Sequence, residues 1–290
     1  MKQKLVSIII PTFNCEEILV DCLESVRKQT YGNIEVIIVD SFSSDSTPEI
    51  AKKYGKVFSF GRNPKQTTIF AVPYQRNYGV EQAQGEFIYW MDSDMRIPED
   101  TIKNSVDLME KENADAIILP EKSYGESFWA KCRALEKDCY NKSPISMTDA
   151  ARFVKKTVWD KIGGLDPTLG GNDDFDFQLR LNDAGYKTIK APFYILHYEG
   201  KLSLSKQLKK KYVYGKNIVE YLKKHKDKKM YLTKQYSLIR PDFIQNYDLL
   251  LRDPLHAVGM IFMKVLEYSA AILGIIESQI KKEKVDLHRV

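Results

Sequence analysis

The sequence predicts an α/β protein in which a mostly parallel, twisted sheet is flanked by helices and followed by a helical extension. Over the first 120 residues, short apolar runs alternate with segments of helical periodicity, an order typical of parallel strands joined by right-handed crossovers. Beyond residue 200 the strand signals stop, and lysine-rich helical segments lead into a long apolar one. We therefore expect a sheet domain over 1–200, a basic helical segment over 201–250 and a C-terminal helix over 251–290.

The strands are predicted by short apolar runs that end at a proline, an acidic residue or a turn, as buried parallel strands do. In chain order these runs are 6–10, 34–39, 57–60, 87–91 and 114–119. Helical periodicity and start signals predict helices between and after them: 14–28, one from Thr47, 74–84, one from Glu99, 126–140 and 173–184. Asn14 and Glu17 have the spacing of a capping box that would open the first of these helices.

The spacing of the four cysteines and the residues at the start of the sequence indicate the cellular compartment in which the protein is expected. Cys15 and Cys22 are seven residues apart, as are Cys132 and Cys139, which is the spacing of one helix face and not of a metal site. Reduced, partly buried thiols in a cytoplasmic protein are expected. A strand signal directly follows residues 1–4, where a secretory signal peptide would have an apolar core, so no signal peptide is expected.

The net charge of +5 conceals a strong asymmetry. Residues 201–240 carry thirteen Lys or Arg and two acidic residues, a balance of +11 that leaves −6 for the rest of the chain. A basic segment on an otherwise acidic protein indicates a polyanionic partner, either anionic lipid or nucleic acid. The alternative is a lysine-rich helix that is only solvated.

The last apolar segment, 255–280, is broken by Lys264 and Glu267. A bilayer span needs about 20 apolar residues, and a charged pair argues against a simple lipid-exposed span. At helical spacing one stripe is apolar, and small or charged residues lie opposite: the stripe is Leu255, Val258, Ile261, Phe262, Val265, Leu266, Ile272, Leu273 and Ile276, and the opposite side holds Lys264, Glu267, Ala271 and Gly274. Basic residues flank the segment at Arg252 and at 281–282.

This pattern favours an in-plane interfacial helix. We therefore expect residues 201–290 to bind an anionic membrane surface, which makes the protein peripheral or monotopic on the inner face of the cell membrane. A true span or a re-entrant hairpin with the charged pair shielded is one alternative, and a packing or oligomer helix is the other. The oligomeric state, including a homo-oligomer, is left open.

The run 87–91 ends at Asp92-Ser93-Asp94, which places two carboxylates at the carboxyl end of a buried strand. Open α/β sheets bind ligands at that edge. Carboxylates separated by one residue can share a Mg²⁺ or Mn²⁺ ion whose other positions are filled by substrate phosphates. The motif alone is not specific, because Asp174-Phe175-Asp176 is a second instance in the same chain.

Five ordered motifs together resemble glycosyltransferase family 2, and the resemblance covers about residues 5–200. These motifs are the opening strand VSIIIPTFN (6–14), IIVDSFSSDST (37–47) in place of the usual VDDGSxDGT, QRNYG (75–79) with Gly85-Glu86, MDSD (91–94), and GNDDFDFQLRL (171–181), which is similar to the acceptor-side EDxDLxxRL helix. The resemblance implies the GT-A nucleotide-sugar fold. It also implies inverting, metal-dependent transfer of a hexose from a UDP- or GDP-sugar.

The resemblance implies a donor site over the carboxyl ends of the first strands. Its nucleotide-sugar-binding residues would be Pro11, Thr12, Asn14, Asp40, Arg76, Asn77, Asp92 and Ser93. Three of these have a structural alternative: Asp40 as a turn aspartate, Asn14 as a helix cap and Arg76 as a member of an ion pair.

By the same resemblance, Asp94 would ligate Mn²⁺ or Mg²⁺ directly, Asp92 would face the ribose and the sugar, and His197 would be a third ligand. Such a metal ion stabilises the charge that grows on the leaving nucleoside diphosphate. For His197 the alternative is a strand histidine with ordinary hydrogen bonds.

Asp174 is the expected general base, because direct displacement needs one carboxylate to take the proton of the acceptor hydroxyl. It falls in the first turn of a predicted helix, where the dipole favours a carboxylate. Asp173 stands where the family usually has glutamate, so the base is either Asp174 or Asp173. Asp176 precedes Arg180 by four residues and is expected to form an ion pair with it. A single base without a nucleophile implies inversion.

Ser41 and Phe42 depart from the family, which commonly has Asp-Gly at these two positions. Losing the second acid affects nucleotide choice, and the nucleobase, uracil or guanine, stays open.

Three other functions were weighed. The acidic 173–176 helix favours a sugar hydroxyl as acceptor, carried on a lipid at the cytoplasmic membrane face, over the lipid phosphate of a polyprenyl-phosphate sugar synthase. A nucleotidyltransferase would need a glycine-rich loop after the first strand, which PTFN is not. A non-catalytic membrane- or nucleic-acid-binding module on the same fold would not need Asp92, Asp94 and Asp174 together, so no nucleic acid partner is expected.

Overall fold

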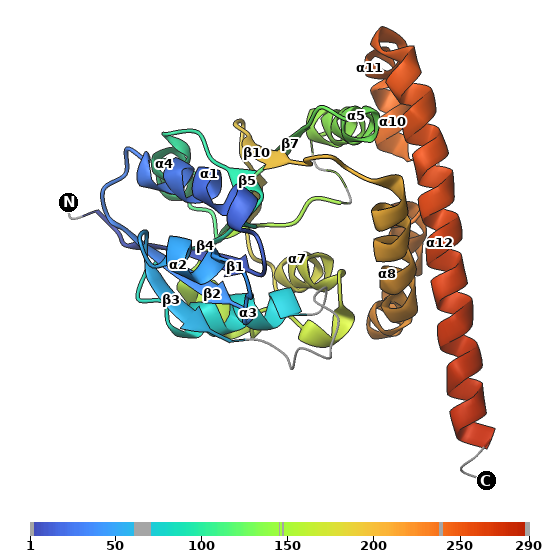
Figure 1. The fold of residues 1–290 in the computed structure, drawn as a ribbon, viewed down its shortest axis with the longest axis horizontal. Coiled ribbons are helices and arrows are strands. Elements are labelled where there is room, and N and C mark those ends of the chain that lie inside the picture. The colour runs from blue at the N-terminus through green and yellow to red at the C-terminus, as the bar shows by residue number, and fades with distance from the viewer. Residues whose placement is uncertain (1–2, 61–70, 145, 147, 238–239, 288–290) are drawn as a thin grey trace. The chain divides into compact units, whose positions relative to one another are not determined.

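The structure is a computed structural model that describes residues 3–60, 71–144, 146, 148–237 and 240–287, the last seven of these by their backbone alone. The chain forms two compact units (Figure 1). The sheet unit comprises 1–122, 149–167 and 173–198, and the helical unit comprises 123–148, 168–172 and 199–290. The last segment of the helical unit begins at Glu199. Two earlier segments also belong to the helical unit.

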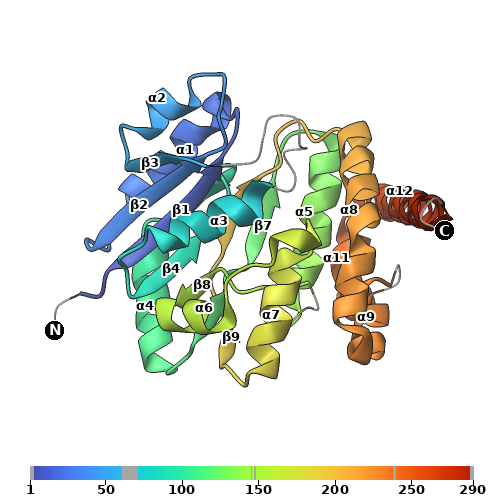
Figure 2. The same ribbon diagram turned by 90° about the horizontal axis from the view of Figure 1, so that it is seen from below.

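The sheet unit is built on a seven-stranded sheet in the order β3-β2-β1-β4-β8-β6-β9 (Figure 2). The strands are β1 Val6–Thr12, β2 Ile34–Asp40, β3 Lys56–Ser59, β4 Phe87–Trp90, β6 Ala116–Ile118, β8 Phe153–Lys155 and β9 Thr188–Lys190. β1 pairs in parallel with β2 on one side and with β4 on the other, and β8 is antiparallel to both of its neighbours. The predicted α/β class with a mostly parallel sheet is confirmed.

Helices cover both faces of this sheet because successive strand residues point to opposite sides. Ile8 and Ile10 pack with α1 (Glu16–Arg27) and α4 (Thr101–Lys111). Ile9 packs on the other face, which is covered by α3 (Ala71–Glu81), α6 (Lys156–Ile162) and α7 (Asp173–Asp183). Gly79 lets α3 lie close on β1, since a Cβ there would meet Ile9 Cγ2 at 2.5 Å.

The predicted capping box at Asn14 is wrong. Asn14 has φ 43°, and α1 begins after Cys15 without a side-chain cap of its own. The N–H groups at the start of α1 bond instead to the first residue of α2 (Thr47–Ala51) and to the loop before it. The Cys15 N–H donates to Thr47 Oγ1 at 2.8 Å, and the Glu16 N–H donates to Asp45 Oδ2 at 3.2 Å. A contact between distant segments has replaced the local one.

A second, smaller sheet has the order β5-β10-β7, with β5 Met95–Arg96, β7 Glu121–Tyr124 and β10 Ile195–Tyr198. β10 runs antiparallel to β5, and His197 is the register partner of Met95. This pairing brings His197 beside Asp94, the residue before Met95, although about a hundred residues of chain separate them.

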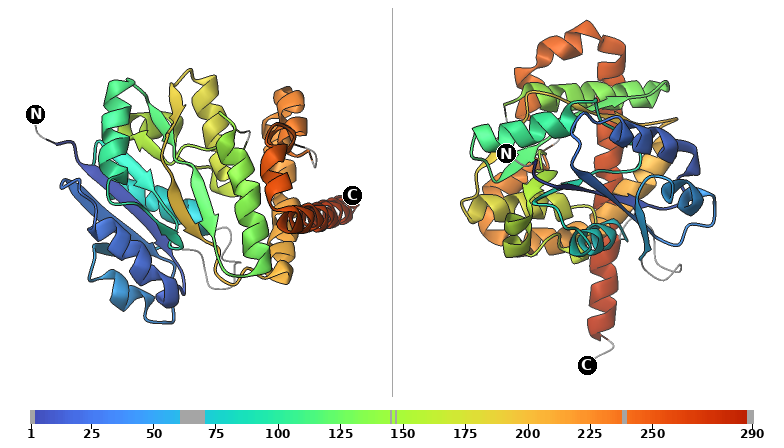
Figure 3. Two further views of the ribbon diagram at one scale, coloured as in Figure 1. Left: turned by 90° about the horizontal axis from the view of Figure 1, so that it is seen from above. Right: turned by 90° about the vertical axis from the view of Figure 1, so that its left-hand side faces the viewer.

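The helical unit contains α5 Phe128–Lys142, α8 Leu204–Lys224, α9 Lys229–Gln235, α10 Pro241–Gln245, α11 Tyr247–Arg252 and α12 Pro254–Leu287. α8 and α12 lie side by side (Figure 1, Figure 3). Their backbones approach at Gly215 and Gly274, because a Cβ on Gly274 would meet the Tyr212 carbonyl oxygen at 2.1 Å. The lysines at 281–282 lie outside the described side chains. All four cysteines are buried free thiols, as predicted.

The two charged residues in the middle of α12 are turned inward. Lys264 and Glu267 are buried, and Lys264 Nζ donates to Glu136 of α5 at 2.6 Å. Arg133 of α5 pairs with both Glu136 and Glu267. The predicted apolar stripe is exposed except at Leu266, which is half-buried. Its exposed members are Leu255, Val258, Ile261, Phe262, Val265, Ile272, Leu273 and Ile276, and Ile280 extends the same surface.

Candidate functional site

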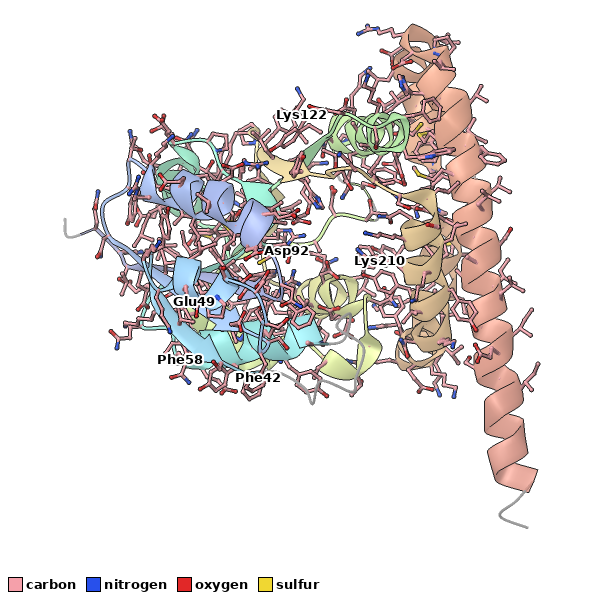
Figure 4. All side chains as sticks on the ribbon, viewed as in Figure 1. Phe42, Glu49, Phe58, Asp92, Lys122 and Lys210 are labelled. Atoms are coloured by element: carbon pink, nitrogen blue, oxygen red, sulfur yellow. The ribbon has the colours of Figure 1, made fainter. Side chains whose placement is uncertain are left out.

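Asp92 follows the carboxyl end of β4 (Figure 4). In the sheet, β2 lies on one side of β1 and β4 on the other, so the direction in which strands are added reverses between β1 and β4. Arg76 of α3 donates from Nη2 to Asp92 Oδ1 at 2.5 Å, and Arg152, just before β8, has Nη1 3.4 Å from Asp92 Oδ2. Burial disfavours charge on Asp92, but the two guanidinium groups outweigh it and hold the pKa of this carboxyl well below its usual range. Asp92 is therefore ionised and clamped between two arginines.

The contacts continue to the metal-binding candidates. Arg152 donates from Nε and Nη2 to Glu121 Oε1 at 3.0 and 2.7 Å. Glu121 Oε2 lies 3.2 Å from His197 Nδ1, and His197 Nε2 lies 3.3 Å from Asp94 Oδ2. Together they form what we call the charge chain, in which positive and negative groups alternate: Arg76, Asp92, Arg152, Glu121, His197 and Asp94.

Electrostatics in the charge chain also set the state of the imidazole. Burial opposes protonation of His197, but its hydrogen bonds to Asp94 and Glu121 raise its pKa to about 10. Arg152 and Glu121 were missed in the sequence because neither belongs to one of the five motifs. Arg152 directly precedes β8, which is brought to the site by its antiparallel pairing with β4, and Glu121 is the first residue of β7. No local sequence pattern predicts that either residue belongs to the site.

The described residues fit a divalent cation. Asp94 Oδ1 is buried and has no hydrogen-bond partner among them, and Asp94 Oδ2 faces His197 Nε2. No group of three or more His, Cys, Asp or Glu side chains in the described ranges would hold a metal ion alone. Asp94 and His197 would supply two ligands, His197 after the cation has displaced the proton from its Nε2, and the other positions would be left to diphosphate oxygens and water. Asp92 is already committed to its two arginines.

Asp40, at the carboxyl end of β2, is 2% exposed. Its carboxylate accepts hydrogen bonds from Thr12 Oγ1 at 3.0 Å and from the Ser43 N–H and Oγ at 2.8 and 2.6 Å. The alternative of a turn aspartate therefore describes what Asp40 does in this structure. Gln75 adds to the same edge by donating to the carbonyl oxygens of Thr12 and Val39 at 3.0 and 2.6 Å.

The loops after β1 and β2 are joined to each other. The Asn14 N–H donates to Ser43 Oγ at 2.8 Å, and the Ser44 N–H donates to Asn14 Oδ1 at 2.8 Å. Asn14 thus joins the loops after β1 and β2 and caps no helix. Pro11 is buried within β1, and Ser93 is half-buried in the turn between the two aspartates.

Phe42 has φ 56°, in the left-handed region that few bulky residues occupy. Its side chain is 55% exposed, and that of Phe13 in the facing loop is 41% exposed.

Asn77 bonds to the backbone of Leu165. Its amide nitrogen donates to the Leu165 carbonyl oxygen at 2.8 Å, and its amide oxygen accepts from the Leu165 N–H at 3.0 Å. This reciprocal pair holds the turn after α6 and directs the side chain toward the backbone. Arg76 remains at the site, within the ion pairs that were its alternative.

The two candidate bases at the start of α7 differ in their surroundings. Asp173 is buried, and its Oδ2 lies 3.8 Å from Arg76 Nη1. Asp174 is half-buried. Asp176 accepts from Arg180 Nε at 2.7 Å, which confirms the expected ion pair. Of the two candidates, Asp174 is the more accessible to an acceptor.

Comparison with known proteins identifies two matching family models. Residues 7–165 match the model described as Glycosyl transferase family 2, and residues 87–276 match one described as Glycosyl transferase family group 2.

One relative matches most of both chains. It is the dolichyl N-acetyl-alpha-D-glucosaminyl phosphate 3-beta-D-2,3-diacetamido-2,3-dideoxy-beta-D-glucuronosyltransferase of Methanococcus voltae, 27% identical over 241 residues, which are 72% of this chain and 71% of that protein. Matches to two other curated relatives span 41% and 21% of their lengths.

Solved structures share the fold. The mannosyltransferase PcManGT from Pyrobaculum calidifontis, in complex with GDP-Man and Mn²⁺, has a TM-score of 0.66 at 17% identity over 94% of this chain and 88% of that one. Staphylococcus aureus TarS 1-349 in complex with UDP-GlcNAc has a TM-score of 0.55 at 17% identity over 98% and 92%. Identities this low show the fold alone, and that fold is GT-A, as expected.

The substitution Glu121→Gln should weaken Mn²⁺ binding by about tenfold, the usual scale for losing a partner behind a metal-binding histidine. The amide removes the negative charge that orients His197 through Nδ1. Calorimetric titration of Mn²⁺ into protein mixed with UDP or GDP measures the effect. Glu35→Gln is the matched control, since Glu35 is also a partly buried, hydrogen-bonded carboxylate but lies near the start of β2. Equal affinities for both variants would contradict the prediction.

Proposed function

The chain belongs to glycosyl transferase family 2, and we propose that it moves a hexose, with inversion, from a UDP- or GDP-sugar to a hydroxyl group of a saccharide acceptor. The observation that carries this proposal is the charge chain, which ends in the unpartnered Asp94 oxygen at the carboxyl end of β4. Ligands bind at this edge of open α/β sheets.

On the donor side, Asp94 and His197 would hold Mn²⁺ or Mg²⁺. The cation would supply neutralising charge to the leaving nucleoside diphosphate. Arg76 and Arg152 hold Asp92 ionised and in place, so that its carboxylate can orient the ribose and the sugar. Glu121 holds the His197 ring through Nδ1 and leaves Nε2 directed toward Asp94.

On the acceptor side, Asp174 would take the proton of the attacking hydroxyl. The new bond forms between the acceptor oxygen and the anomeric carbon while the bond from that carbon to the diphosphate oxygen breaks, and the electron pair leaves with the diphosphate. Asp173 is paired with Arg76 and is less available for this step. Because attack and departure occur on opposite faces of the sugar, the product has the inverted configuration.

The comparisons support the proposed class of donor and acceptor by analogy. The structural neighbours bind GDP-Man or UDP-GlcNAc, and the Methanococcus voltae relative is named for an acceptor sugar on a dolichyl phosphate. We propose a lipid-linked saccharide at the cytoplasmic membrane face as the acceptor. A polyprenyl-phosphate sugar synthase is the alternative, and the acidic start of α7 favours a hydroxyl nucleophile over a phosphate.

Calorimetric titration of UDP and of GDP, each with Mn²⁺ and with EDTA, tests the donor site. We expect one nucleotide to bind with Mn²⁺ and to lose most of its affinity in EDTA. Without the cation, no positive charge links the diphosphate to Asp94 and His197. Failure of both nucleotides to bind folded protein would overturn the proposed function.

Asp174→Asn should leave nucleotide affinity intact and lower turnover by roughly 10²-fold, the usual scale for a lost general base. Asp173→Asn is the matched variant. It should weaken donor binding instead, since it removes a partner of Arg76. Turnover on a saccharide acceptor and calorimetric nucleotide affinity are measured for both. The reverse pattern would assign the base to Asp173.

We also propose that the exposed face of α12 lies in the interface of an anionic membrane. The segment Pro254–Ile280 has a mean hydropathy of 1.6 over its most apolar window, and 33% of that window is buried within the protein. None of its Asp, Glu, Lys or Arg side chains is exposed: Lys264 and Glu267 are buried, and Glu277 pairs with Lys216 at 2.6 Å. An apolar outside with charges inside is the reverse of a water-facing helix.

An in-plane position fits this face better than a span. α8 packs along α12, and its Lys206, Lys209, Lys210 and Lys223 are exposed. A span of α12 would carry these lysines into hydrocarbon, at a cost of about 3 kcal/mol each at the bilayer centre. In the interface, the same lysines and the +11 balance of 201–240 favour anionic lipid headgroups.

Val265→Glu should lower co-sedimentation with anionic vesicles by about tenfold, because it replaces an exposed apolar side chain that would enter the lipid interface with a charged one. Val20→Glu is the matched control: Val20 and Val265 are 40% and 43% exposed, and Val20 lies on α1. Neutral vesicles should bind the wild type more weakly than anionic ones. Unchanged binding of Val265→Glu would contradict the membrane proposal and leave the catalytic proposal intact.

A further inference from the structure

We infer that Phe42 forms one wall of the nucleobase pocket by stacking on the base. The inference rests on the proposed function and identifies the part of the nucleotide that this residue recognises. It concerns a position where the chain departs from glycosyltransferase family 2, which commonly has glycine there.

The backbone around Phe42 is held by its neighbours. Asp40 accepts from the Ser43 N–H and Oγ, which closes the turn that contains Phe42. Ser43 Oγ in turn accepts from the Asn14 N–H, and the Ser44 N–H donates to Asn14 Oδ1. The turn is thus tied at both ends and to the loop after β1. These contacts hold the backbone of the turn that carries Phe42.

The conformation of Phe42 is unfavourable for its residue type. Its φ of 56° lies in the left-handed region, where Cβ crowds the backbone. Glycine would adopt this conformation without strain. The ring obtains little burial in return, since the side chain is 55% exposed. Strained residues held by their surroundings cluster at ligand sites, so the strain and the exposure together point to a bound partner for the ring.

The partner chemistry follows from the location. Phe42 follows β2, whereas the diphosphate and cation side lies at Asp92 and Asp94 after β4. β1 separates β2 from β4. Two strand spacings of about 4.8 Å each divide the two positions. A nucleotide lying across the strand ends with its diphosphate at Asp94 places its base at the loops after β1 and β2.

An exposed aromatic ring suits a nucleobase, whose flat face stacks on aromatic side chains. Phe13 in the loop after β1 is 41% exposed and directly precedes Asn14, the residue that is bonded to Ser43. Phe13 directly precedes Asn14 and Phe42 directly precedes Ser43, so each ring lies one residue before the hydrogen bond that joins the two loops. Figure 4 marks Phe42 on the same unit as Asp92.

The experiment compares wild type with Phe42→Ala, Phe42→Gly and Phe42→Trp. Each protein is titrated by calorimetry with UDP and GDP in Mn²⁺, and separately with inorganic pyrophosphate in Mn²⁺, which has no base. We expect Phe42→Ala and Phe42→Gly to lose about tenfold in nucleotide affinity and Phe42→Trp to retain it, the scale of one stacking contact. Pyrophosphate affinity should be the same in all four proteins.

Thermal unfolding separates the ring from the backbone. Phe42→Gly relieves the left-handed strain and should melt at a higher temperature than Phe42→Ala, while both lose nucleotide affinity equally. Asn113→Gly is the matched control: Asn113 has φ 46° in the turn after α4, so it introduces glycine at a similar conformation away from the site. It should leave nucleotide affinity unchanged.

The outcomes distinguish the inference from the function beneath it. Metal-dependent nucleotide binding that is equal in wild type and Phe42→Ala would overturn the stacking role and leave the donor site standing. A parallel loss of pyrophosphate affinity would also overturn it, because the ring would then be supporting the loop and not the base. Absence of nucleotide binding in wild type would overturn both.

Discussion

The site depends on one electrostatic constraint: Asp92 at the end of β4 is ionised between Arg76 and Arg152. Removing either arginine would leave a carboxylate that is costly to keep charged away from water. The same two arginines reach further, to Asp173 and to Glu121. A single acidic residue thereby ties α3, β4, β8 and the start of α7 into one arrangement.

The helical unit satisfies a similar constraint by burying its charges as hydrogen-bonded pairs. Lys264 and Glu267 would be expensive inside an apolar helix packing, but Glu136 and Arg133 of α5 neutralise them. With its charges inside and its apolar side chains outside, α12 presents the apolar surface on which the membrane proposal rests. Under the proposed function, the sheet unit carries the chemistry and the helical unit binds the membrane that holds the acceptor.

Prediction from sequence succeeded where the information is local or carried by ordered motifs. The buried strands, the fold class, the α12 stripe and the Asp176–Arg180 pair are all short-range patterns. It failed where a distant group competes for the same atoms. Asn14 does not cap α1, because Thr47 and Asp45 accept from the N–H groups at the start of that helix. Matching a motif identifies a residue but does not show which neighbouring group forms hydrogen bonds with its side chain.

By itself, the sequence determined the α/β class, the placement of Asp92 and Asp94 at a strand end, and the existence of a basic segment followed by an apolar helix. These properties follow from periodicity, charge and order along the chain. Only the tertiary structure decided that Arg152 and Glu121 join the site, that the charges of α12 face inward, and that Phe42 is left-handed and exposed. These features depend on which groups meet at β8, at α5 and at the loops after β1 and β2. They are decided by hydrogen bonds and burial between segments that are far apart in the sequence.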